Sequence, residues 1–292
     1  MRLMTAGFRM MKMKYKESYE NGIKTLERAG INEAKLDARL LLECVCGTDH
    51  SALIAHPDRE LTEDEISRYD EFIERRAKRE PVAYILGSWD FMGLSFNVSS
   101  DVLIPEQDSE FLVEEAMRHC EDGFKVLDLC TGSGCIGLSI LNYTNYTTAV
   151  CTDISKKALE VAKSNAEKLG LSERVEFIET DLFPETMEKK ADIIVSNPPY
   201  IRTDVIETLA PEVKDFEPGL ALDGDSDGLK FYRRIIDKAP EYLFSSGYLI
   251  MEIGYDQADQ VKDLLEKAGV YHAIEVVKDF SGNDRVITAC YY

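Results

Sequence analysis

Apolar positions in the first eighty residues recur with the period of a helix and show no strand-like alternation. Tyr19, Ile23 and Leu26 follow one another at three- and four-residue spacing. Further on, Thr62 with Glu65 three residues later forms a capping box ahead of another apolar face. Glycine and proline residues interrupt the pattern between these stretches. The sequence therefore predicts a bundle of about four helices in this part of the chain.

A different pattern begins at Pro81 and lasts until Pro105. Residues 89–98 read as two short strands on either side of Gly93, because apolar and aromatic residues bracket a glycine that favours a turn. We interpret this stretch as a β-hairpin that links the bundle to the rest of the chain.

From residue 125 onward, short apolar runs alternate with stretches of helical period, which is typical of a parallel sheet covered by helices on both faces. We expect strands at residues 125–129, 148–152, 175–179, 192–196, 248–253, 273–277 and 285–290, and helices at 135–142, 155–169, 229–238 and 257–267. The last two strands are joined by too few residues for a helical crossover, so they should pair antiparallel. The chain is therefore predicted to have three parts: a helical bundle over residues 1–80, a hairpin linker over 81–105, and an α/β domain over 106–292.

The first predicted strand of the α/β domain runs into a glycine turn that opens a helix. Glycines there let the backbone pass close to a ligand, and the start of the helix offers free N–H groups. Gly132, Gly134 and Gly137 also satisfy the dinucleotide fingerprint, with Asp153 at the expected distance along the chain. The turn alone therefore leaves a dinucleotide-dependent oxidoreductase open.

Three acidic residues at the ends of successive strands favour S-adenosylmethionine over a dinucleotide. Asp128, just before the turn, would repel a pyrophosphate but attract the amino group of a methionine moiety. Asp153 can accept hydrogen bonds from two ribose hydroxyls, and Asp181 from the adenine amino group. Ligands of open α/β sheets bind at these strand ends. We therefore predict a Rossmann-like sheet of the class I S-adenosylmethionine methyltransferase type.

A second motif, Asn197-Pro198-Pro199-Tyr200, follows the fourth predicted strand. Two prolines remove two N–H donors, so that the Asn197 side-chain oxygen and the Pro198 carbonyl oxygen can face a substrate NH2 group as fixed acceptors. Tyr200 supplies an aromatic ring beside that group. No strong base is required, because the proton becomes acidic as the N–C bond forms. The motif predicts a methyltransferase acting on a planar amide-type nitrogen, although a rigid surface turn would have the same sequence.

The composition narrows the functional classes further. With 45% hydrophobic and 30% charged residues, the 292-residue chain has the composition of a soluble globular protein, and no apolar run reaches the roughly 18 residues of a membrane span. A formal net charge of −20 would repel a nucleic-acid duplex. Seven cysteines without paired spacing predict a cytoplasmic setting, no disulfide framework and no metal site. We expect a monomer, read residues 1–16 as a ragged start without a signal peptide, and regard Met11 or Met13 as a candidate first residue.

Several segments together resemble the release-factor glutamine N5-methyltransferases, the HemK or PrmC type, over nearly the full length of the chain. The segments are Pro-Val-Ala-Tyr-Ile-Leu-Gly at 81–87, Val-Leu-Ile-Pro at 102–105, Asp-Leu-Cys-Thr-Gly-Ser-Gly at 128–134, Ser-Asn-Pro-Pro-Tyr-Ile at 196–201, Phe-Glu-Pro-Gly-Leu-Ala-Leu at 216–222, Asp-Gly-Leu at 227–229, Glu-Ile-Gly at 252–254 and Gly-Asn-Asp-Arg at 282–285. Asn-Pro-Pro-Tyr by itself also occurs in adenine and guanine amino-methyltransferases, so the glutamine assignment depends on the other segments.

The resemblance implies a substrate, a docking role and a set of site residues. The acceptor would be the glutamine amide in the Gly-Gly-Gln motif of a class I peptide chain release factor, which the N-terminal bundle would dock. With the residues argued above, the cofactor set becomes Asp128, Cys130, Thr131, Gly132, Ser133, Gly134, Asp153, Asp181, Leu182 and Asn197. The catalytic set is Asn197, Pro198, Pro199 and Tyr200.

The chain departs from the family pattern at three places. Ile104-Pro105 is followed by Glu106 and Gln107, where the family has arginine and proline, which puts the role of that loop in doubt. Cys130 stands where glycine is common, which a small side chain tolerates if its φ is negative. Asp225 replaces a frequent glycine. We expect an active enzyme, because no residue of the acceptor motif is altered.

Two further hypotheses compete with this assignment. A DNA or RNA amino-methyltransferase would share both motifs but needs a basic recognition region, and the only notable basic cluster is the short stretch 75–79 at the end of a predicted helix. A non-catalytic module that binds a translation factor through the bundle would account for the departure at Glu106. Calorimetry with S-adenosylmethionine distinguishes that module from an enzyme.

Overall fold

The structure is a computed structural model that describes residues 13–292, and its contacts divide the chain into two units, Met1–Leu86 and Gly87–Tyr292. The expectation of a first residue at Met11 lies outside the described residues, and so does the predicted ragged start as far as residue 12, whereas its last two residues, Tyr15 and Lys16, are already helical. Between residues 13 and 292, no helix has both the length and the apolar character needed to cross a membrane.

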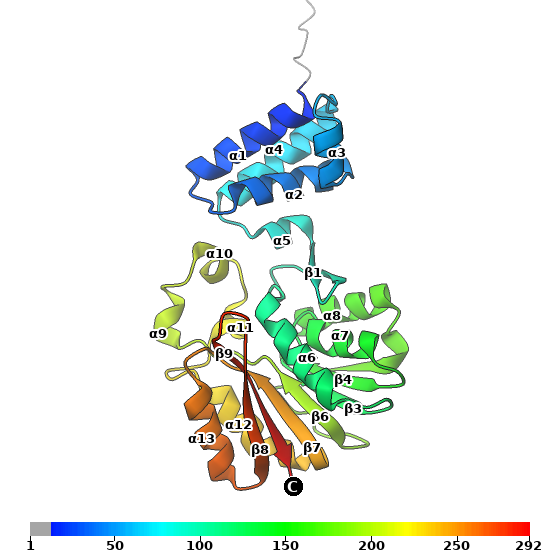
Figure 1. Ribbon diagram of the computed structural model, residues 1–292, viewed down its shortest axis with the longest axis vertical. Helices are drawn as coiled ribbons and strands as arrows, with labels where there is room; N and C mark the ends of the chain where they lie inside the picture. Colours follow the sequence, from blue (N-terminus) through cyan, green and yellow to red (C-terminus); the bar gives the residue numbers. More distant parts are fainter. Residues whose placement is uncertain (1–12) are drawn as a thin grey trace, which may run out of the picture. The chain divides into compact units, whose positions relative to one another are not determined.

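The N-terminal unit is a helical bundle, as predicted. Its helices are α1 (Tyr15–Arg28), α2 (Ala34–Cys46), α3 (His50–Ala55), α4 (Glu63–Ala77) and α5 (Val82–Leu86) (Figure 1). The capping box is present, since Thr62 Oγ1 accepts from the N–H of Glu65 and the Glu65 carboxylate accepts from the N–H of Thr62. Ile85 of α5 packs in the same core as Leu41 and Tyr69. The apolar side chains therefore tie α5 to the bundle.

The predicted hairpin is present as β1 (Ser88–Phe91) and β2 (Leu94–Asn97), which pair antiparallel around a turn at Gly93. Phe91 and Phe96 are buried in one core of the second unit. The N–H of Asn97 also donates to Asn165 Oδ1 at 2.6 Å. The hairpin is thus packed onto the second unit and does not form a free linker.

The second unit is built on a seven-stranded sheet whose order is β5-β4-β3-β6-β7-β9-β8. Its strands are β3 (Lys125–Leu129), β4 (Thr148–Asp153), β5 (Val175–Glu179), β6 (Ala191–Ser196), β7 (Leu243–Glu252), β8 (Tyr271–Lys278) and β9 (Asp284–Tyr291). The strands β3 to β7 are parallel, and β9 pairs antiparallel with both β7 and β8. The antiparallel pairing of β8 with β9 was predicted. Only β7 begins much earlier than expected, because its first residues include exposed polar side chains that hide the strand pattern.

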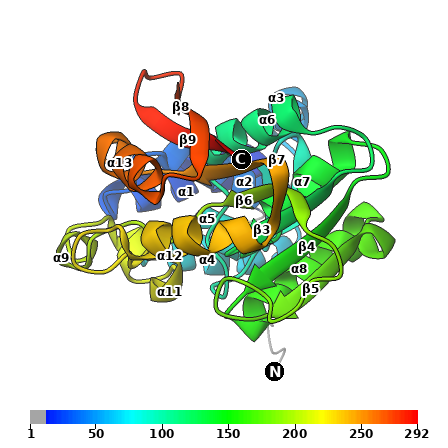
Figure 2. The ribbon, with the colours of Figure 1, turned by 90° about the horizontal axis from the view of Figure 1, so that it is seen from below.

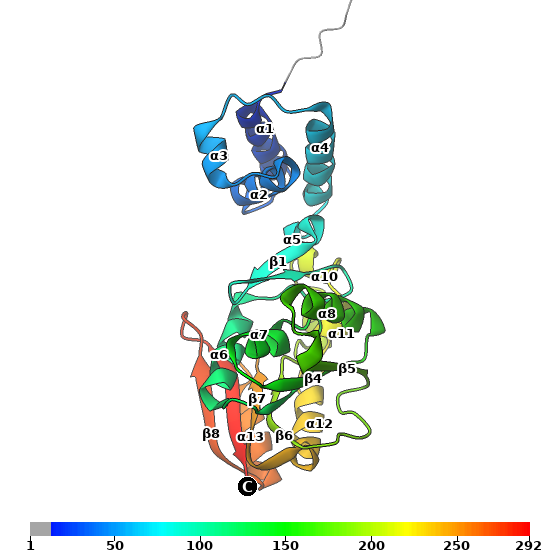
Figure 3. The ribbon, with the colours of Figure 1, turned by 90° about the vertical axis from the view of Figure 1, so that its right-hand side faces the viewer.

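Five longer helices cover the two faces of the sheet. They are α6 (Glu110–His119), α7 (Cys135–Tyr143), α8 (Lys156–Leu169), α12 (Lys230–Lys238) and α13 (Ala258–Ala268). Figures 2 and 3 show α6 and α7 on the face opposite α12 and α13. The expectation of a doubly covered parallel sheet is confirmed, whereas α6 and the short helices α9 (Thr203–Ile206), α10 (Pro211–Lys214) and α11 (Gly219–Leu222) were not predicted.

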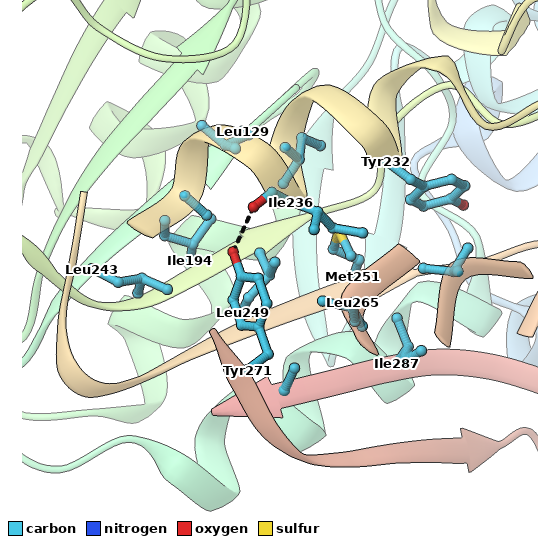
Figure 4. Close-up of a cluster of buried hydrophobic side chains, with 14 of the residues drawn as sticks. Leu129, Ile194, Tyr232, Ile236, Leu243, Leu249, Met251, Leu265, Tyr271 and Ile287 are labelled. Atoms are coloured by element: carbon cyan, nitrogen blue, oxygen red, sulfur yellow. Dashed lines mark hydrogen bonds between the residues drawn. The ribbon is translucent and has the colours of Figure 1, made fainter. Parts of the chain in front are cut away.

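The larger core lies between the sheet and the helices α12 and α13. Leu129, Ile194 and Met251 contribute from neighbouring strands, and Ile236 packs on them from α12 (Figure 4). Burying each such side chain stabilises the fold by roughly 1.5–3 kcal/mol. The hydroxyl of Tyr271 donates to the Ile236 carbonyl oxygen at 2.7 Å, so this buried polar atom is satisfied. This packing fixes the carboxyl ends of the strands, where the loops that follow β3, β4, β6 and β7 meet.

Candidate functional site

A cavity of about 300 Å³ opens at the carboxyl ends of the parallel strands in the second unit. Its wall combines polar and apolar side chains from segments that are far apart in the sequence. The lining residues are 101–106, Ser109, 130–133, Cys135, Ile136, 153–155, Ala158, 181–182, Asn197, Pro199, Pro218, Leu220, Ala221, Lys230, Phe231 and Arg234. A cavity with one polar wall and several aliphatic side chains suits an amphiphilic small molecule.

Most of the residues expected at a cofactor site line this cavity. They are Cys130, Thr131, Gly132, Ser133, Asp153, Asp181, Leu182 and Asn197. Four of the expected site residues are not among those that line the cavity: Asp128, Gly134, Pro198 and Tyr200. The structure therefore brings most of the expected residues together at one cavity.

Two glycines of the turn adopt the left-handed backbone conformation that favours glycine. Gly134 has a φ of 81°, and a Cβ there would lie 3.0 Å from Leu138 and 3.2 Å from Ala162. Gly132 has a φ of 55° but faces open space. Its N–H donates to Asp153 Oδ2 at 2.9 Å. Glycine at 134 thus allows both the left-handed backbone and the close approach of α7 to α8.

Asp128 lies beneath the turn and is fully buried. Its Oδ2 atom accepts hydrogen bonds from Thr131 Oγ1 at 2.5 Å and from the N–H of Gly137 at 3.1 Å. A Cβ at Gly137 would stand 2.9 Å from that oxygen, which explains the glycine at this position. Burial raises the pKa of Asp128 to about 7. The carboxylate tethers the turn to the start of α7 and does not line the cavity.

Cys130 adopts a backbone conformation that the sequence argument did not anticipate. A small side chain would be tolerable there at a negative φ, but that condition is not met, because the φ of Cys130 is 59°. The family's glycine therefore corresponds to a real left-handed position, where a side chain costs roughly 1–2 kcal/mol. Burial raises the pKa of the Cys130 thiol, so it remains protonated near neutral pH.

Asp153 and Asp181 stand on neighbouring strand ends but in different surroundings. Asp153 accepts from the N–H groups of Gly132 and Ser155, and burial raises the pKa of its carboxyl. Asp181 is exposed, and its Oδ2 accepts from Arg234 at 2.9 Å. Leu182, beside it, is buried. Both carboxylates reach the cavity, although Asp181 already has a cationic partner.

The acceptor motif is held by a buried carboxylate from β7. Asn197 Nδ2 donates to Ser109 Oγ at 3.1 Å, and Ser109 Oγ donates to Glu252 Oε2 at 2.5 Å. The hydroxyl of Tyr200 donates to the other oxygen of Glu252 at 3.2 Å. Throughout residues 13–292, nothing hydrogen-bonds to Asn197 Oδ1. This oxygen is therefore a side-chain acceptor that is available to a substrate.

The back of the same turn is packed against a glycine loop. A Cβ at Gly228 would lie 2.5 Å from the Tyr200 carbonyl oxygen, and a Cβ at Gly224 would lie 2.8 Å from the Tyr200 backbone. Gln257 Nε2 donates to that carbonyl oxygen at 3.0 Å. Asp225, which replaces a frequent glycine of the family, has a φ of 74°. The loop therefore keeps the left-handed backbone although the glycine is gone.

Sequence reasoning missed several residues around the acceptor motif. Glu252 has a pKa raised to about 7 by burial, and Glu217 has a pKa raised to about 7 by burial and by Glu106. Arg285 forms ion pairs with Asp108 and Asp279 nearby. The segments that contain Glu252 and Glu217 were visible as family matches. Their roles depend on contacts between distant parts of the chain, which no local pattern reveals.

Two sequence profiles and many curated proteins match this chain. The profile of the PrmC N-terminal domain matches residues 17–87, and that of the methyltransferase small domain matches residues 104–212. The release factor glutamine methyltransferase of Clostridium acetobutylicum is 41% identical over 281 residues, covering 95% of this chain and 98% of the relative. That of Clostridium botulinum is 42% identical over 275 residues, covering 93% of this chain and 97% of the relative.

A solved structure supports the fold alone. A methyltransferase from Pyrococcus furiosus superposes with a TM-score of 0.51 at 15% identity, covering 77% of this chain and 98% of the other. The fold expected from the sequence is therefore confirmed, and so is the resemblance in sequence. Both profiles and relatives of nearly equal length agree, and the chain belongs to the release factor glutamine methyltransferase family.

Proposed function

We propose that this chain transfers a methyl group from S-adenosylmethionine to the N5 side-chain amide of glutamine in the Gly-Gly-Gln motif of class I peptide chain release factors. The observation that carries the proposal is the orientation of Asn197, whose amide nitrogen is engaged by Ser109 while its oxygen remains unengaged at the cavity wall. A fixed oxygen acceptor at that place suits an NH2 group.

The cavity fits the proposed cofactor in its polar and apolar features. Ser133 Oγ is buried and has no hydrogen-bond partner among the described residues, so it remains available to a polar ligand. Asp153 offers carboxylate oxygens suited to ribose hydroxyls, while Leu182 and Phe231 offer apolar surface for a base. When bound, S-adenosylmethionine supplies an electrophilic methyl group. Asp128 would act indirectly, by holding the glycine turn in its conformation.

The acceptor residues would overcome the weak nucleophilicity of an amide by orientation. Asn197 Oδ1 and the Pro198 carbonyl oxygen would accept the two N–H groups, which turns the nitrogen lone pair toward the cavity. Tyr200 also belongs to this site. Its hydroxyl donates to Glu252, which accepts a second hydrogen bond from Ser109, the partner of the Asn197 amide. The proton released from the nitrogen would pass to water, so these residues need not act as a strong base.

Methyl transfer to a purified release factor tests the proposal. The full chain is incubated with methyl-labelled S-adenosylmethionine and the release factor, and the product is mapped by peptide mass spectrometry. We expect the label on the glutamine of Gly-Gly-Gln. A release factor with that glutamine replaced by glutamate serves as the matched control and should remain unlabelled.

Parallel reactions with total RNA and with duplex DNA distinguish the alternative acceptors. Label on a nucleic acid and none on the release factor would contradict the proposal. Absence of transfer to any acceptor, with S-adenosylmethionine binding intact by calorimetry, would favour the non-catalytic binding module.

We also propose that the N-terminal unit docks the release factor and that the enzyme acts as a cytoplasmic monomer. Deleting residues 1–86, the whole N-terminal unit, should leave cofactor affinity nearly unchanged and raise KM for the release factor, because docking energy is lost. Equal KM values for the truncated and full chains would contradict docking by this unit. Light scattering after gel filtration tests the monomer.

A further inference from the structure

Glu252 is the centre of a buried hydrogen-bond chain that reaches both ends of the acceptor motif. Glu252 lies at the end of β7 and is 1% exposed. Oε2 accepts from Ser109 Oγ at 2.5 Å, and Oε1 accepts from the Tyr200 hydroxyl at 3.2 Å. Ser109 Oγ in turn accepts from Asn197 Nδ2 at 3.1 Å. One carboxylate is therefore linked to the first and the last residue of Asn-Pro-Pro-Tyr.

The charge of Glu252 sets the direction of this chain. An ionised carboxylate has no hydrogen to donate, so the single hydroxyl hydrogen of Ser109 must point to Glu252. Ser109 Oγ then has only lone pairs left for Asn197. The asparagine must present its NH2 group to Ser109, which leaves Oδ1 facing the acceptor. The orientation of the Asn197 amide thus follows from the protonation state of a residue that does not line the cavity.

We propose that Glu252, acting through Ser109, is the positioning residue that keeps the Asn197 side-chain oxygen turned toward the acceptor, and that neutralising Glu252 reverses the chain and disables the site. The inference rests on the proposed function, since it assigns the control of the same acceptor oxygen.

A proton on Glu252 Oε2 reverses the hydrogen bonds from Glu252 to Ser109 and from Ser109 to Asn197, while Oε1 still accepts from the Tyr200 hydroxyl. A protonated Glu252 donates to Ser109 Oγ, whose own hydrogen is then free to point to Asn197. Ser109 donates to Asn197 Oδ1, and the amide turns its NH2 group toward the acceptor. Two NH2 groups then face each other, and neither supplies the oxygen that the acceptor nitrogen needs.

The surroundings of Glu252 bring this change into the neutral pH range. The pKa of Glu252 is raised to about 7, mainly by burial and also by the charge of Glu106, whereas the hydrogen bonds from Ser109 and Tyr200 and the charge of Arg285 oppose the rise. Arg285 forms ion pairs with Asp108 and Asp279 rather than with Glu252. The titratable or charged groups that face the carboxylate are Glu106, Cys135, Tyr200, Tyr232 and Arg285.

Two substitutions test the hydrogen-bond chain, one at Glu252 and one at Ser109, and each has a matched control. Glu252→Gln removes the charge and keeps the shape, and Glu115→Gln makes the same change at a residue that is 4% exposed on α6. Ser109→Ala removes the middle link. Its control is Ser139→Ala, at a fully buried serine on α7. Neither control residue lines the cavity.

Single-turnover methyl transfer is measured from about pH 5.5 to about pH 8.5, with cofactor affinity determined at each pH. We expect the wild-type rate to rise with pH through a midpoint near 7, because the ionised fraction of Glu252 rises. Glu252→Gln and Ser109→Ala should each lose roughly 10²-fold in turnover and lose that pH-dependent limb. Their cofactor affinity should stay within a few-fold of wild type, and both controls should keep the wild-type profile.

A measurement without turnover separates this inference from the proposed function. The Asn197 side-chain NH2 resonances, assigned by their loss in Asn197→Asp, are followed by NMR through the same pH range. We expect them to shift with a midpoint near 7 in the wild type and to stay constant in Ser109→Ala. If Glu252→Gln does not fold, Ser109→Ala and this titration decide the question.

Each outcome distinguishes the two proposals. Wild-type enzyme that never methylates a release factor overturns the proposed function, whatever the NMR titration gives. Efficient wild-type transfer combined with pH-independent Asn197 resonances overturns the positioning role of Glu252. So does a Ser109→Ala variant, which lacks the middle link, that keeps turnover within about threefold of wild type.

Discussion

Asp153 Oδ2 accepts a hydrogen bond of 2.9 Å from the N–H of Gly132, which joins the loop after β4 to the glycine turn after β3. The same carboxylate accepts from the N–H of Ser155 through its other oxygen. Asp153 therefore shapes the cavity wall as well as lining it. Each carboxylate oxygen retains a second lone pair that can accept from a ligand hydroxyl.

Asp153→Ala should weaken S-adenosylmethionine binding by about 1.5–3 kcal/mol, the worth of hydrogen bonds to a charged acceptor. Isothermal titration calorimetry measures the affinity. Asp192→Ala is the matched control, because Asp192 also accepts from a backbone N–H, that of Lys125, but does not line the cavity. An affinity unchanged in Asp153→Ala would remove this residue from the cofactor site.

Cys130 offers a test of backbone strain in the glycine turn. Cys130→Val should destabilise the protein by about 1–3 kcal/mol, because a β-branched side chain fits a φ of 59° poorly. Cys130→Gly relieves the strain but makes the unfolded chain more flexible, so its stability should stay within about 1 kcal/mol of wild type. Denaturant titration gives the free energies of unfolding. A valine variant as stable as the glycine variant would show that the turn adjusts its φ.

Two glycine variants distinguish backbone strain in a loop from displacement of the acceptor turn at Tyr200. Gly228→Ala and Gly170→Ala both place a side chain at a left-handed φ, of 73° and 70°, and this backbone strain alone should cost roughly 1–2 kcal/mol of stability at each position. Only at Gly228 would the new Cβ meet the Tyr200 carbonyl oxygen, at 2.5 Å, whereas Gly170 has nothing within 4 Å. We therefore expect Gly228→Ala alone to lose turnover. Equal turnover in the two variants would mean that the position of the acceptor turn does not depend on this contact.

Local patterns predicted the elements that build the sheet. The strand at residues 175–179 and the helix that starts near residue 230 follow from apolar spacing alone, and both are present. The short helices α9, α10 and α11 were missed, since four residues are too few for a helical period to be visible. No helix was therefore predicted between β6 and α12, although Pro218, Leu220 and Ala221 from this stretch line the cavity.

The sequence predicted those site residues that directly follow the end of a strand. Asp153 and Asn197 were found in this way, and both line the cavity. The direction of a side chain was not predictable, so Asp128 was expected at a ligand and is instead tied to Thr131 beneath the turn. The contact of Ser109 with Glu252 joins positions 143 residues apart, and only the folded chain brings them together.

Asn197→Ala tests the acceptor site most directly. It removes the one asparagine oxygen without a partner at the cavity wall, and the glutamine amide would lose one of two fixed acceptors. Turnover should fall by about 10²–10³, or roughly 2.7–4 kcal/mol, while S-adenosylmethionine still binds. Single-turnover transfer to a purified release factor gives the rate, and calorimetry on the same sample gives the affinity.

Two further variants make the Asn197 result specific. Asn97→Ala is the matched control, because Asn97 Nδ2 also donates to a serine hydroxyl, that of Ser164, yet Asn97 does not line the cavity. It should keep wild-type turnover. Asn197→Asp retains an acceptor oxygen but cannot donate to Ser109, and it adds a charge near Glu252, so its turnover should fall between alanine and wild type. If Asn197→Ala keeps more than about half of wild-type turnover, the Asn-Pro-Pro-Tyr segment is a rigid turn and the acceptor must bind elsewhere.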